Sequence, residues 1–162
     1  MIGRLSSVVL LALTVVACND DGDETGDGPQ AEPFFPEDFA ARYTEVRPCM
    51  PSGDHDLNNV RILVDAAAHD PYVDRVAPFP VGAVLLKAEY DFGDAQCSGD
   101  PTQWTVMRKL AAGSAPATLD WAWQTVDADR RVLDEDLPRC ISCHTGCGVA
   151  PDGYDGACAI LP

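Results

Sequence analysis

The chain has 162 residues, with 26 acidic against 11 basic side chains and a formal net charge of −15. This length accommodates one domain with a tail, and an apolar content of 46% is enough for a folded core. So large a surplus of acid excludes nucleic-acid binding, which needs a basic patch, and also excludes electrostatic adhesion to anionic lipid headgroups. Seven cysteines in so short a chain indicate an exported protein.

The N-terminus resembles the signal peptide of a bacterial lipoprotein. Arg4 precedes a largely apolar stretch over residues 5–17, which is too short to span a bilayer. The stretch ends in Val15-Val16-Ala17-Cys18, which resembles a lipobox. We therefore predict a signal peptide over residues 1–17, lipidation of Cys18, and membrane anchoring that faces the periplasm or the cell exterior. The alternative is an ordinary cleaved signal peptide followed by a chance cysteine.

An acidic segment follows the lipobox. Residues 19–28 hold five acidic side chains, three glycines and no apolar residue. Such a composition cannot form a core, so residues 18–32 are predicted to be a flexible tether and residues 33–162 the folded domain.

The domain shows the patterns of an α+β fold. The elements predicted, in chain order, are a helix from Pro36 with Phe39, Tyr43 and Val46 on one face, a strand over 57–65, a short helix over 65–69, and strands over 83–91, 102–110 and 119–127. In the strand over 83–91, Lys87 lies on the face opposite to Val84 and Leu86, beside Leu85 and Glu89. Strands without long helices between them favour a mainly antiparallel sheet with a few short helices.

The sequence Cys140-Ile141-Ser142-Cys143-His144 has the spacing of a c-type haem attachment motif. Two cysteines at this separation reach the two vinyl groups of haem, and the adjacent histidine supplies the proximal nitrogen to iron. We therefore predict one covalently bound haem c near the C-terminus, with His144 as the axial ligand. The alternatives are a zinc site that also uses Cys147, and a redox-active dithiol.

The remaining cysteines of the domain are disulfide candidates. With Cys18 lipidated and two cysteines on haem, Cys49, Cys97, Cys147 and Cys158 are left, and they allow three pairings. We favour Cys49–Cys97 and Cys147–Cys158, the second of which would hold the chain that follows the haem motif.

The position of the motif excludes the common electron-transfer cytochromes. Only 18 residues follow His144 and none is a methionine, whereas that class has an early motif and a distant axial methionine. The long helical periods of the four-helix-bundle cytochromes are also missing.

Several stretches together resemble the cytochrome P-460 family, in the branch related to the β-sheet cytochromes c′. In chain order they are residues 35–39 (FPEDF), 59–64 (NVRILV), 79–89 (FPVGAVLLKAE), 104–109 (WTVMRK), 120–124 (DWAWQ) and the motif over 140–144. Val81 departs from the turn residue that the family usually has before the glycine.

The resemblance implies a function. In enzymes of this family a lysine on the strand after the Phe-Pro-x-Gly turn is cross-linked to haem, and Lys87 occupies this place. We therefore expect an oxidoreductase that oxidises hydroxylamine or a related small nitrogen species and passes electrons to a redox partner protein. A homodimer is usual for the family. The alternatives are a non-enzymatic protein that binds nitric oxide, with a pocket capped by Phe34, Phe39 or Phe79, and an electron-transfer cytochrome.

Other residues around the haem are assigned only as candidates. The sixth-ligand candidates are Met50, His55, His69 and Met107; none stands out, so we favour five-coordinate iron. The candidate proton acceptors are Glu89, Asp134, Glu135 and Asp136. Arg61 and Arg108 are either partners of the haem propionates or surface residues. Trp104, Trp121 and Trp123 are predicted to pack in the core or line the haem.

Overall fold

The computed structural model describes residues 30–53, 55, 58–150 and 153–158. The predicted signal peptide, Cys18, most of the tether and the first residue of the strand predicted over 57–65 lie outside these residues. Within the described ranges, no helix has both the length and the apolar character needed to cross a membrane.

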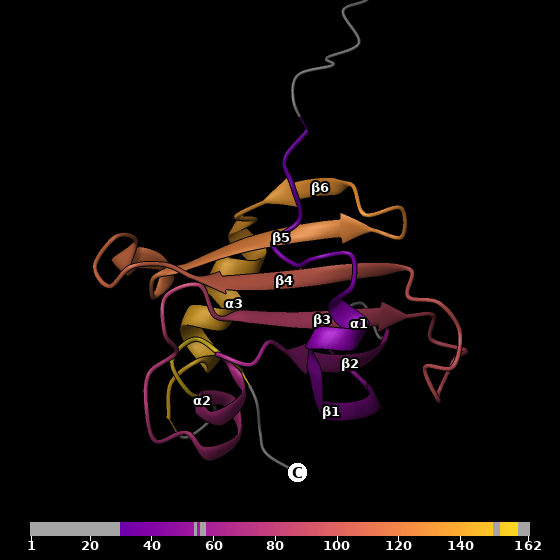
Figure 1. Ribbon diagram of the computed structural model, residues 1–162, viewed down its shortest axis with the longest axis horizontal. Coiled ribbons are helices and arrows are strands. Elements are labelled where there is room, and N and C mark those ends of the chain that lie inside the picture. Colours follow the sequence, from indigo (N-terminus) through magenta and orange to yellow (C-terminus); the bar gives the residue numbers. More distant parts are fainter. Residues whose placement is uncertain (1–29, 54, 56–57, 151–152, 159–162) are drawn as a thin grey trace, which may run out of the picture.

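A six-stranded antiparallel sheet forms the centre of the fold, and its strands follow one another in chain order (Figure 1). The strands are β1 Thr44–Pro51, β2 Asn59–Val64, β3 Val84–Tyr90, β4 Gln103–Lys109, β5 Trp121–Asp127 and β6 Val132–Glu135. The helices are α1 Phe39–Arg42, α2 His69–Asp74, the 3-10 helix η1 Pro116–Thr118 and α3 Pro138–Cys147. The predicted class, a mainly antiparallel sheet with a few short helices, is confirmed.

The four predicted strands correspond to β2, β3, β4 and β5, while the remaining elements differ from the prediction. The helix predicted from Pro36 is only the four residues of α1, and Val46 belongs to β1. The helix ends at Arg42, and the backbone of Tyr43 is already extended. The short helix predicted over 65–69 begins at His69 instead and continues to Asp74.

Both faces of the sheet are covered. The segment before β1, with α1, packs on one face, and α3 with the C-terminal segment packs on the other (Figure 1). Val84, Leu86, Ala88 and Tyr90 of β3 face the α1 side, where they join one buried cluster. Leu85 belongs to the other cluster, on the α3 side. The alternation predicted for this strand is therefore confirmed.

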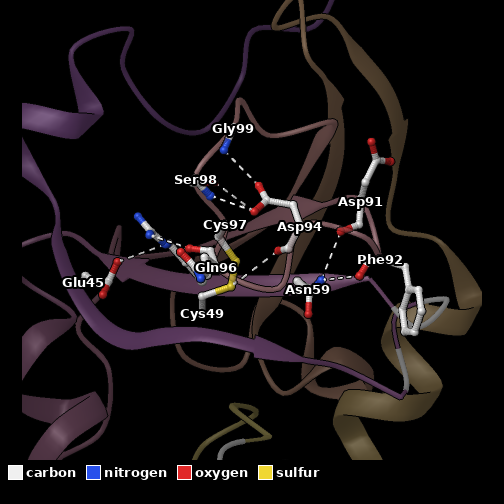
Figure 2. Close-up of a disulfide and its surroundings, with 11 residues drawn as sticks. Glu45, Cys49, Asn59, Asp91, Phe92, Asp94, Gln96, Cys97, Ser98 and Gly99 are labelled. Carbon is white, nitrogen blue, oxygen red and sulfur yellow. Dashed lines mark hydrogen bonds and ion pairs between the residues drawn. A yellow bond between two sulfur atoms is a disulfide. The ribbon is translucent and has the colours of Figure 1, made fainter.

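The structure contains both of the disulfides predicted from the sequence. Cys49–Cys97 joins β1 to the loop after β3, and Cys147–Cys158 joins the end of α3 to the C-terminal segment. Figure 2 shows the first of these, where Asp94 accepts hydrogen bonds from the backbone amides of Ser98 (3.0 Å) and Gly99 (2.9 Å). Two disulfides are consistent with export, because the cytosol keeps thiols reduced.

Candidate haem site

A cavity of about 360 Å³ lies on the side of the sheet that α3 covers. Its walls come from β1, β2, β3, β4, β5, α2, α3 and the C-terminal segment. The lining residues include Arg47, Met50, His55, Val60, Ile62, Leu85, Lys87, Glu89, Gln103, Thr105, Met107, Trp123, Arg139, Cys140, Cys143, His144, Cys147 and Cys158.

The register of the sheet explains why residues far apart in sequence share this cavity. Lys87 on β3 is paired with Ile62 on one side and Thr105 on the other. Because side chains directly opposite one another in an antiparallel sheet point to the same face, each of these rows presents its side chains together to the cavity. Two residues further along β3, Glu89 is paired with Val60 and Gln103.

Helix α3 presents the haem motif to the same cavity. It begins at Pro138, whose missing N–H costs nothing in the first helical turn. Cys143 and His144 follow Cys140 by three and four residues, so both lie on the same side of the helix as Cys140. Neither Cys140 nor Cys143 is in a disulfide, and burial raises the pKa of the Cys140 thiol.

The zinc interpretation does not hold, because Cys147 is bonded to Cys158 and has no thiolate to offer. The structure also brings together no group of three or more metal-binding His, Cys, Asp or Glu side chains among the residues it describes.

His144 is held in one tautomer. Its Nδ1 donates to the carbonyl oxygen of Gly156 at 2.8 Å, which leaves Nε2 with the lone pair that a metal requires. Burial lowers the pKa of His144 to about 4, so the imidazole is neutral at neutral pH. The ring centre of Trp123 lies 6.2 Å from that of His144.

Three polar side chains that line the cavity, those of Lys87, His55 and Glu89, contact one another. The Nζ of Lys87 hydrogen-bonds to Nε2 of His55, and Nδ1 of His55 lies 3.5 Å from a carboxylate oxygen of Glu89. Glu89 is 2% exposed and accepts hydrogen bonds from Gln103 (2.8 Å) and Thr105 (2.9 Å). Burial acts to raise the pKa of Glu89, but the hydrogen bonds from His55, Gln103 and Thr105 outweigh it, so the pKa lies below its ordinary value.

We therefore expect Glu89→Gln to lower the free energy of unfolding at neutral pH but not in acid. A carboxyl group whose pKa is lower in the folded protein stabilises that state fully above its ordinary pKa, and the contribution is lost as the pH falls through the folded pKa. At neutral pH the variant should lose about 1.5–3 kcal/mol of the free energy of unfolding, the usual worth of hydrogen bonds to a charged group. Urea unfolding at several pH values checks this. The two proteins should converge in acid, and a difference independent of pH would contradict the assignment.

The residues around the cavity fit a c-type haem. The two free thiols and the neutral imidazole are the groups that such a haem uses, and apolar side chains from the five strands β1 to β5 form the opposite wall. Nε1 of Trp123 is buried without a hydrogen-bond partner among the described residues, as expected where a further group belongs. Arg47 and Arg139 line the cavity and supply cations suited to the haem carboxylates. Bound there, haem would supply a redox-active iron, and Cys140, Cys143 and His144 are the residues that would hold it.

Several candidates named from the sequence lie elsewhere. Arg61 is on the other face of β2, within 3.6 Å of Glu45, and the guanidinium of Arg108 lies 3.7 Å from the ring centre of Phe34. Neither arginine lines the cavity. Of the two alternatives given for these arginines, their positions favour the one in which they do not pair with haem propionates. No sequence pattern marked Arg47 and Arg139 as cavity residues, because only the tertiary structure brings them to the cavity.

The other candidates divide between the cavity and the rest of the domain. Of the sixth-ligand candidates, Met50, His55 and Met107 line the cavity, while His69 pairs with Asp70 at the surface. Of the tryptophans, Trp123 lines the cavity, whereas Trp104 and Trp121 are core residues. The residues proposed as an apolar cap do not line the cavity: Phe34, Phe39 and Phe79.

Comparison with known proteins agrees with this site. No curated protein matches the chain. The family model described as Cytochrome P460 matches residues 40–150, a range that begins in α1 and ends just after α3. This range holds all six strands, Lys87 and the complete Cys140–His144 motif. Because the match covers more than half of the chain, the protein belongs to the cytochrome P460 family, whose members carry haem.

Proposed function

We propose that the protein oxidises hydroxylamine or a related small nitrogen compound at a single covalent haem and passes the electrons to a redox partner protein. The observation that carries this proposal is the position of Lys87, whose amine shares one cavity with the haem motif. In the enzymes that the chain resembles, a cross-link from such a lysine to haem accompanies this activity.

The lysine content of the chain supports the choice of Lys87. The chain has two lysines, Lys87 and Lys109. The amine of Lys109 is bonded to Asp155 at 2.7 Å and to the carbonyl oxygen of Leu119 at 2.9 Å. Lys109 does not line the cavity. Lys87 does, and its contact with His55 provides an acceptor for the proton that the amine must lose before it can act as a nucleophile.

We assign Glu89 as the proton acceptor during oxidation. It lines the cavity, and His55 lies between it and Lys87. Asp136 instead accepts a hydrogen bond from the backbone of Trp123, and Glu135 accepts one from Gln124. An ionised carboxylate linked to His55 can take up protons released in the cavity.

The test compares hydroxylamine oxidation by the haem-loaded protein and its Lys87→Ala and Lys87→Arg variants, with an artificial electron acceptor. The spectrum of the ferrous form is recorded alongside. We expect turnover and a red-shifted Soret band in the wild type, and loss of both in each variant. Lys87→Arg keeps the positive charge, so its loss of activity identifies the amine itself as the requirement.

Other outcomes would reject the proposal. An ordinary five-coordinate spectrum that the variants do not alter, with nitric oxide binding but no turnover, would indicate a nitric oxide binder. A six-coordinate low-spin spectrum would indicate electron transfer, with Met50, His55 or Met107 as the ligand to replace next.

We further propose that the protein is exported and anchored by a lipid on Cys18. The two disulfides support export. Metabolic labelling with a radioactive fatty acid tests the anchor, because label should appear in the wild type and be absent from Cys18→Ser. Equal labelling of both would reject it.

A further inference from the structure

We propose that Lys109 and Asp155 are positioning residues for the proximal histidine: together they hold the Gly156 carbonyl oxygen at the Nδ1–H of His144 and so tune the haem iron. This inference rests on the proposed haem placement but not on the proposed substrate. Neither residue lines the cavity, and neither belongs to the haem motif.

The first step is the turn that carries Gly156. Tyr154 and Ala157 exchange backbone hydrogen bonds of 3.0 Å and 2.9 Å, and the two residues between them both have positive φ, 45° for Asp155 and 87° for Gly156. This is the pattern of a tight type I′ turn. The amide of Gly156 donates to Gly148 at 2.9 Å, while its carbonyl oxygen faces His144.

The second step is the anchoring of that turn by Asp155. One carboxylate oxygen accepts from Nζ of Lys109 at 2.7 Å and the other from the backbone amide of Phe79 at 3.0 Å. The backbone carbonyl of Asp155 accepts from Nε1 of Trp121 at 2.7 Å. Asp155 thus has hydrogen bonds to β4, to β5 and to the loop before β3. These bonds hold the turn in place, and the amide of Ala157, bonded to Tyr154, holds the peptide group that contains the Gly156 carbonyl.

The third step concerns the character of the Lys109–Asp155 pair. Lys109 is 8% exposed, and its Nζ lies 4.9 Å from the ring centre of Trp121. The Asp155 side chain is 24% exposed, so the pair is partly buried. Removing two charges from water is costly, which makes such a pair a weak source of net stability. The pair instead fixes the position of the turn. Both charges need a partner, and few positions of the turn keep the Asp155 carboxylate next to the Lys109 amine.

The consequence for haem follows from the hydrogen bond to His144. An acceptor at Nδ1 fixes the ring tautomer and raises the basicity of Nε2, which favours ferric over ferrous iron. Losing a bond of this kind commonly changes metal affinity or activity 10- to 100-fold. A tenfold change in the relative affinity for the two oxidation states is about 59 mV for a one-electron couple, so loosening the turn should raise the reduction potential by an amount of this order.

The Cys147–Cys158 disulfide attaches the same segment from its other side. Cys147 is the last residue of α3, and Cys158 follows the turn directly. Opening this disulfide should therefore raise the potential in the same direction as loss of the Asp155 carboxylate.

The experiment measures the reduction potential and the iron–histidine stretching frequency, by resonance Raman spectroscopy, of the haem-loaded protein without substrate. The variants are Asp155→Ala, Asp155→Asn and the double variant Cys147→Ala/Cys158→Ala. The matched controls are Asp94→Ala, which also removes a carboxylate that orders a disulfide-closed loop, and Cys49→Ala/Cys97→Ala. Thermal unfolding is recorded for each protein.

We expect Asp155→Ala and the Cys147/Cys158 variant to raise the potential and lower the stretching frequency. Asp155→Asn keeps an acceptor oxygen, so it should shift both less, and the two controls should change neither. If Asp155→Ala does not fold, the reduction potential and stretching frequency of Asp155→Asn are compared with those of the wild type instead.

The proposal is overturned if the Asp155 variants lose stability as Asp94→Ala does while the potential and frequency stay at wild-type values. Because no substrate is present, this result is independent of hydroxylamine turnover. A protein that shows the shifts but no turnover would reject the proposed function alone.

Discussion

Replacing both Cys140 and Cys143 with serine is expected to yield a polypeptide without covalently attached haem. The two thiols lie one helical turn apart on the side of α3 that lines the cavity, and serine cannot form a thioether. Haem staining after denaturing electrophoresis and the intact mass both measure the loss. Each single variant should retain haem through one remaining bond.

The matched control removes two sulfurs elsewhere, in Cys49→Ala/Cys97→Ala. This disulfide closes a loop with a sequence separation of 48, and its removal should cost about 2–4 kcal/mol of the free energy of unfolding. Haem should nevertheless stay attached, because neither residue lines the cavity. Covalent haem on the double-serine variant would contradict the assignment of the motif.

The central strands were predictable because apolar side chains recur at every second position. In β3, the residues at 84, 86, 88 and 90 are all buried on one face, so a pattern of period two gives both the strand and the face of Lys87. The edge strands carry weaker signals. β1 contains Pro48 and Pro51, which an edge strand tolerates but which argue against a strand in the sequence, and β6 has only four residues.

The site was predictable only where it is local in sequence. Cys140, Cys143 and His144 form one short motif, and Lys87 follows a turn that forms as expected although Val81 departs from the family pattern. Gly82 takes the positive φ of that turn, 87°, and Val81 points to solvent. In contrast, the Gly156 carbonyl is a backbone group, and only the tertiary structure places it at His144.

Gly156→Ala is expected to destabilise the domain in two ways, through its backbone conformation and through its packing against Trp121. Gly156 has a φ of 87°, and an added Cβ would lie 2.6 Å from Nε1 of Trp121. Trp121 is 1% exposed, and its Nε1 is bonded to the Asp155 carbonyl, so the ring has little room to move. We expect a loss of about 1–2 kcal/mol for the left-handed backbone and about 1–3 kcal/mol more for overpacking.

Gly82→Ala separates the two contributions, because Gly82 has the same φ of 87° but no atom within 4 Å of an added Cβ. This control should lose only the backbone contribution, and chemical denaturation of both variants measures the difference. Equal losses would show that the contact with Trp121 imposes no constraint. A larger loss of unfolding free energy in Gly156→Ala than in Gly82→Ala would show that Trp121 packs tightly against the turn. A reduction potential raised only in Gly156→Ala would show that this packing also holds the Gly156 carbonyl at His144.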